Sequence, residues 1–66
     1  MKLIIHASTY WDQGFWEIDL SEIGTWTATE NVADIQKMAV ECAALWLDVD
    51  PETLDVQVET KVPALI

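Results

Sequence analysis

The stretch GFWEIDL, residues 14–20, is the clearest indication of the fold. Its side chains alternate, so that one face carries Trp16, Ile18 and Leu20. The other face carries Phe15, Glu17 and Asp19. A period of two is typical of an antiparallel strand that packs on a core with one face only. Residues 15–20 are therefore predicted to form such a strand.

The flanking segments predict two more strands joined to this one by turns. Residues 2–10 are rich in Ile, Thr and Tyr and predict a first strand. Residues 11–14 supply the turn that follows, with Gly14 free to take a positive φ. Residues 21–24 form the next turn, and residues 25–28 predict a short third strand.

A helix is predicted from about residue 31 to residue 49. Asn31 is the expected N-cap, with Thr29 as an alternative, and Asp34 places a negative charge in the first turn. Pro51 lies just beyond the expected end of the helix and can begin a single further turn. Apolar residues at helical spacing form the predicted buried stripe: Val32, Ile35, Met38, Ala39, Cys42, Leu45, Trp46 and Val49.

Residues 55–62 predict a fourth strand, because valine and threonine alternate there with charged and polar residues. The element order is β-β-β-α-β. We therefore expect an α+β fold in which one helix packs on one face of a mostly antiparallel sheet. A chain of 66 residues has room for one domain, residues 1–66.

The sheet face turned away from the helix is the predicted interaction site. If Leu3, Ile5 and Ala7 point toward the helix, alternate residues of the first strand point away: Ile4, His6, Ser8 and Tyr10. Phe15, Glu17 and Asp19 join them. Apolar side chains surrounded by charge are typical of a protein interface. The alternative is that these are ordinary scattered exposed apolar residues.

Four tryptophans are divided between core and surface. Trp16, Trp26 and Trp46 lie at predicted inward positions and are expected in the core. Trp11 falls in a predicted turn and is the expected exposed anchor, since tryptophan often dominates binding energy. The candidate partner-binding residues are Tyr10, Trp11, Phe15, Glu17, Asp19 and Glu22.

Residues that could perform catalysis are few. The single histidine, His6, and the single cysteine, Cys42, are predicted on opposite sides of the sheet, so they cannot form a nucleophile–base pair. Zinc needs several Cys or His ligands. The carboxylate pair Glu17 and Asp19 has no evident third ligand, and Pro51 and a missing glycine break the calcium-loop pattern that Asp48 and Asp50 begin. We expect a non-catalytic protein with no metal and no cofactor.

The charge balance indicates the class of partner. Twelve carboxylates oppose three lysines, no arginine is present, and the net charge is −9. Such a charge repels nucleic acid and attracts basic surfaces, although it can also serve solubility alone. No stretch has the roughly 18 apolar residues of a membrane span. A lone cysteine and the absence of a signal pattern at the start predict a cytoplasmic protein.

Three segments carry a resemblance to a known family. They are a Gly-aromatic-aromatic strand at residues 14–20, a Gly-x-x-Thr strand at 24–28 and an alanine-rich helix at 32–47. With the helix exit at 48–51 and the last strand at 55–59, they resemble the HicB-like antitoxin domains. The turn at 21–24 lacks the prolines usual in that family, and Ala28 stands where glutamine is customary.

The resemblance implies an antitoxin that binds and blocks a small basic mRNA-cleaving toxin, and that forms dimers or higher oligomers. Many members add a C-terminal DNA-binding segment, which is not expected in this sequence, so no direct binding of nucleic acid is predicted. Two alternatives remain. One is an acidic mimic of nucleic acid that inhibits a DNA- or RNA-binding enzyme, and the other is an orphan domain that only self-associates.

Overall fold

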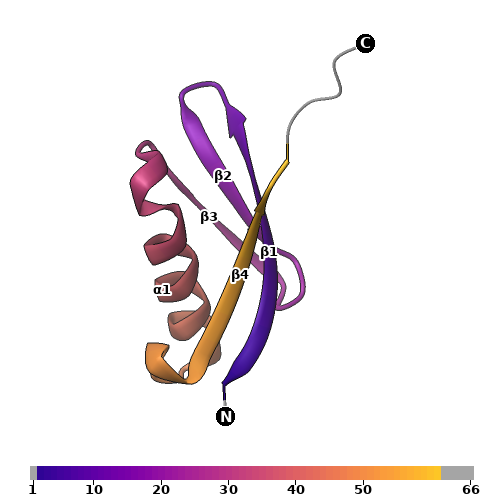
Figure 1. Cartoon of the computed structure of the whole chain (residues 1–66), viewed down its shortest axis with the longest axis vertical. Helices are drawn as coiled ribbons and strands as arrows, with labels where there is room; N and C mark the ends of the chain where they lie inside the picture. Colours follow the sequence, from indigo (N-terminus) through magenta and orange to yellow (C-terminus); the bar gives the residue numbers. More distant parts are fainter. Residues whose placement is uncertain (1, 62–66) are drawn as a thin grey trace.

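The computed structural model describes residues 2–61 as one four-stranded sheet with a helix along one face (Figure 1). The strands are β1 (Leu3–Asp12), β2 (Phe15–Leu20), β3 (Thr25–Thr29) and β4 (Leu54–Thr60). Between β3 and β4 lie a 3₁₀ turn η1 (Val32–Asp34), helix α1 (Ile35–Leu47) and a second 3₁₀ turn η2 (Pro51–Thr53). The predicted α+β class and β-β-β-α-β order are confirmed.

The sheet has the strand order β3-β2-β1-β4. β1 pairs with β2 and β2 with β3 in antiparallel fashion, as hairpins require, whereas β4 runs parallel to β1 after the crossover through α1. The sheet is therefore mostly antiparallel, as predicted. The predicted strand at 55–62 begins one residue earlier, at Leu54, and Val62 lies outside the described residues.

The first hairpin is longer than predicted. Its turn is only Gln13 and Gly14, which both take positive φ, at 50° and 94°. Two-residue turns of this kind match the twist of the strands and let pairing continue up to the turn. β1 therefore extends to Asp12, and Trp11 lies in a strand opposite Trp16 rather than in a turn.

The helix is shorter than predicted at both ends. The Asn31 side chain accepts a hydrogen bond of 3.0 Å from the Ala33 N–H, so Asn31 is a cap, but of η1 rather than of α1. Asp48 takes a left-handed conformation with φ 55° and ends α1, as C-terminal residues of helices often do. Asp50 then caps η2 by accepting a hydrogen bond from the Glu52 N–H at 2.9 Å.

The core lies between α1 and the inner face of the sheet, the face that the helix covers. Its sheet members are Ile5, Ala7, Ile18, Leu20, Leu54 and Val56, and its helix members are Ile35, Ala39, Ala43 and Ala44. The predicted helical stripe is wrong in part, because Leu45 is 84% exposed and Val32 and Val49 are also exposed. Three of the four buried helix residues are alanines, which allows the helix to pack closely on the sheet.

Two of the three tryptophans expected in the core are at the surface. Trp26 is 65% exposed and Trp46 is 58% exposed, whereas Trp16 is half-buried against the core as expected. Trp26 is paired with Asp19 in the β2–β3 register and therefore shares the face on which Asp19 lies. Trp46 lies at the flank of α1, where its Nε1 donates a hydrogen bond of 2.7 Å to the carbonyl of Ile23.

Candidate functional site

The outer face of the sheet, opposite α1, is the candidate site. Figure 1 shows the helix lying along one side of the sheet only. Strand alternation and register place thirteen side chains on the outer face: Ile4, His6, Ser8, Tyr10, Asp12, Phe15, Glu17, Asp19, Trp26, Ala28, Asp55, Gln57 and Glu59.

No helix among residues 2–61 is both long and apolar enough to cross a membrane.

The predicted binding residues divide between this face and other places. Four of the six lie on the outer face: Tyr10, Phe15, Glu17 and Asp19. Trp11 does not, because alternation along β1 turns it to the opposite side, where its ring meets that of Trp16 edge-on at a centroid distance of 5.5 Å. Glu22 lies in the turn between β2 and β3, at the margin of the outer face.

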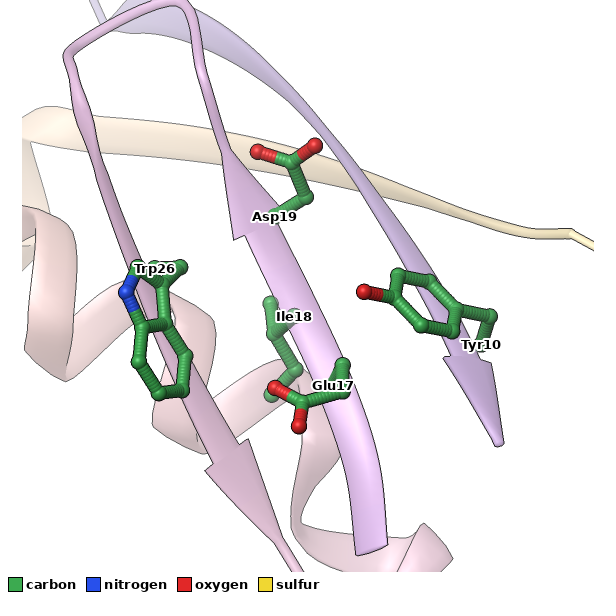
Figure 2. A pocket seen from close by; sticks show the side chains of 5 residues that line it. All are labelled: Tyr10, Glu17, Ile18, Asp19 and Trp26. Carbon is green, nitrogen blue, oxygen red and sulfur yellow. The ribbon is translucent and has the colours of Figure 1, made fainter. Parts of the chain in front are cut away.

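A pocket of about 390 Å³ lies on the outer face. Figure 2 shows Glu17 and Asp19 on β2 between Tyr10 on β1 and Trp26 on β3, with Ile18 behind them. Strand pairing produces this arrangement, because Tyr10 lies opposite Glu17 and Asp19 lies opposite Trp26. Sequence reasoning missed Trp26 as part of the site, because the short strand β3 turns its apolar residues to the outer face and its threonines to the inner face.

The outer face is strongly acidic. Five carboxylates lie on it, those of Asp12, Glu17, Asp19, Asp55 and Glu59. The ion pair found within residues 2–61 is between His6 and Glu22, and it neutralises none of the five. Like charges gathered on one face attract cations and basic protein surfaces. The exposed Ile4, Tyr10, Phe15 and Trp26 add apolar area to this acidic face.

The side chain of Glu22 accepts a hydrogen bond from the backbone of β1 at the margin of the outer face. Pairing between β1 and β2 begins at Ser8, so the backbone N–H of His6 lies outside the stretch of β1 that pairs with β2. The Glu22 Oε1 atom accepts a hydrogen bond of 2.7 Å from that N–H, and Oε2 lies 3.3 Å from His6 Nδ1. These hydrogen bonds lower the pKa of Glu22 below its usual value of 4.5. The bond from the His6 backbone has the larger effect and the bond to the His6 side chain the smaller.

This geometry makes a prediction for the pH dependence. The ionised form of Glu22 is favoured in the fold, so its stabilising effect is present above pH 4.5 and is lost as the pH falls through the lowered pKa. A carboxyl-carbon NMR titration should find Glu22 titrating below the usual glutamate pKa. His6→Ala should keep most of the shift, because the backbone N–H is its main cause. A usual pKa for Glu22 in the wild-type chain would contradict the observed contact.

Other reactive side chains do not form a site. His6 lies on the outer face, whereas Cys42 packs against the core on the helix side with its Sγ 3.8 Å from the carbonyl oxygen of Trp26. Within residues 2–61 no three His, Cys, Asp or Glu side chains are grouped to hold a metal ion.

A second, smaller pocket of about 270 Å³ lies at the C-terminal end of α1 beside Leu45 and Pro51.

Comparisons with protein-family models, with curated proteins and with solved structures found no match to this chain.

Proposed function

We propose that this protein is a non-catalytic binding domain of the HicB antitoxin type, whose outer sheet face binds and inhibits a basic protein such as a small mRNA-cleaving toxin. The observation that carries the proposal is the combination, within residues 2–61, of exposed aromatic rings and unpaired carboxylates on the sheet face opposite α1. Aromatic residues supply much of the binding energy of protein interfaces, and complementary charge supplies speed and specificity.

The charge of the outer face favours a basic partner over a second copy of the chain. Two outer faces placed together would bring ten carboxylates into one interface, and like charges in an interface cost free energy. A homodimer or higher oligomer, which the family resemblance implies, would therefore use another surface. Sedimentation of wild type and Phe15→Ala tests this point, and dissociation of an oligomer by Phe15→Ala would place self-association on the outer face.

The proposed location is the cytoplasm. Cys42 is a single free thiol that packs against the core, and such cysteines persist in a reducing compartment. A toxin that cleaves messenger RNA would act in the same compartment.

Binding should depend on the aromatic residues of the outer face. Tyr10→Ala and Phe15→Ala should each weaken the affinity for a captured partner at least about tenfold, because central aromatic anchors dominate binding. Leu45→Ala is the matched control, since Leu45 is exposed on α1, away from the outer face. Tagged wild type and variants would be used to capture proteins from a lysate of the source organism, and affinities of a purified partner would be measured by calorimetry.

The outcomes of this experiment separate the proposed function from its alternatives. A small basic ribonuclease that binds wild type and Leu45→Ala, and whose RNA cleavage the wild-type chain inhibits, would support the proposal. Equal binding by Tyr10→Ala and Phe15→Ala would exclude the outer face. Capture of a large nucleic-acid enzyme that is lost steeply with salt would instead support the nucleic-acid mimic, since charge-driven binding is screened by ions.

A further inference from the structure

The pocket on the outer face has the composition of a site for one cationic side chain. Two aromatic rings, Trp26 and Tyr10, flank two carboxylates, Glu17 and Asp19 (Figure 2). Ring faces attract cations, and Trp is the strongest of the aromatic residues in this respect. Both rings remain available, since Trp26 is 65% exposed and Tyr10 is 42% exposed.

The two carboxylates of the pocket, Glu17 and Asp19, project from the same face of β2. No ion pair to Glu17 or Asp19 is found among residues 2–61, and both side chains are half-buried between their neighbours. They are two residues apart on β2, which corresponds to about 7 Å along a strand. One planar guanidinium between them can donate hydrogen bonds to both, at about 2.8 Å each. A cation here would be held from two sides.

We propose that this pocket binds an arginine side chain of the partner protein, with the guanidinium stacked on Trp26 and hydrogen-bonded to Glu17 and Asp19. The inference rests on the proposed function, because it names the chemistry by which the outer face recognises a basic partner. Arginine fits better than lysine, since only the planar guanidinium can stack on a ring and donate along its edges at the same time.

Other occupants fit the pocket less well. A divalent cation prefers six or more oxygen ligands, and the pocket offers two carboxylates and one phenol. A nucleic acid would bring phosphates against Glu17 and Asp19, which is repulsive. A neutral side chain would leave both carboxylates without a hydrogen-bond donor.

The test uses the full chain and a short peptide, acetyl-Gly-Gly-Arg-Gly-Gly-amide, followed by NMR at low ionic strength. The indole N–H signal of Trp26 and the backbone signals of Glu17 and Asp19 should move as the peptide is added. The indole signal of Trp46, which is bonded to the Ile23 carbonyl, is the internal reference and should not move. The same peptide with citrulline in place of arginine keeps the shape without the charge and should leave Trp26 unshifted.

Matched variants separate the pocket from the general acidity of the chain. Glu17→Gln with Asp19→Asn removes two charges from the pocket, and Asp55→Asn with Glu59→Gln removes two charges elsewhere on the outer face. The pocket pair, and separately Trp26→Leu, should lower the association constant at least about fivefold. The control pair should lower it less than about twofold, because separated exposed charges are screened.

Three outcomes would overturn the arginine site: equal losses from the pocket and control pairs, equal shifts of Trp26 by the citrulline peptide, or tighter binding of a lysine peptide. If one of these results is found but a basic protein is still captured through Tyr10 and Phe15, the arginine site is wrong and the proposed function is retained. A chain that binds the arginine peptide in the pocket but captures no basic protein would uphold the site and count against the proposed function.

Discussion

Ile18→Ala is expected to remove a large part of the free energy of unfolding of this protein. The Ile18 side chain has no exposed surface and lies in the middle of β2, within the core cluster between sheet and helix. Truncating a buried isoleucine to alanine costs about 2–5 kcal/mol, because the transfer free energy is lost and a cavity remains. At about 0.05–0.15 kcal/mol per residue, a chain of this length has a total of only about 3–10 kcal/mol.

Urea denaturation followed by tryptophan fluorescence would measure this effect. Leu45→Ala is the matched control: it deletes a side chain of the same size from a position that is 84% exposed. The control should change the free energy of unfolding by less than about 0.5 kcal/mol. If Ile18→Ala were as mild as Leu45→Ala, the core described above could not be the one that stabilises the fold.

Ala43→Leu is expected to have the next largest effect, through overpacking rather than a cavity. Ala43 is completely buried on the face of α1 that packs against the sheet, next to Ala39 and Ala44. Extra methylene groups in a packed core force side chains from their rotamers or shift the backbone, at a cost of about 1–3 kcal/mol. The helix would have to move away from the sheet to admit them.

The control for this variant is Ala33→Leu, because Ala33 is an exposed alanine in η1. Alanine and leucine both favour helical conformations, so a difference between the two variants reports packing and not backbone preference. Thermal unfolding followed by circular dichroism would compare them with wild type. An Ala43→Leu variant as stable as Ala33→Leu would mean that α1 does not lie tightly on the sheet.

Four of the predicted binding residues lie on the outer face as expected from the sequence, whereas the pocket residue Trp26 was not expected there. Phe15, Glu17 and Asp19 lie on β2, whose alternation assigns each side chain to a face. The outer position of Tyr10 follows once the odd-numbered residues of β1 are taken to face the helix. Trp26 belongs to β3, whose inward positions are filled by threonines. Hydrophobicity alone therefore assigned Trp26 to the core, and the pocket that it completes could not be predicted.

The order of the elements, the α+β class and the two faces of β2 could be predicted from the sequence, because strand alternation and helical spacing are local properties of the chain. The outer position of Trp26, and the alanines rather than Leu45 on the inner face of α1, could not be predicted from local patterns and result from tertiary packing. Both depend on the relative placement of two elements, through strand register or through packing. The register of the β2–β3 hairpin places Trp26 beside Asp19. Close packing of α1 on the sheet favours alanine where the helix lies nearest to it, and Leu45 is left outside.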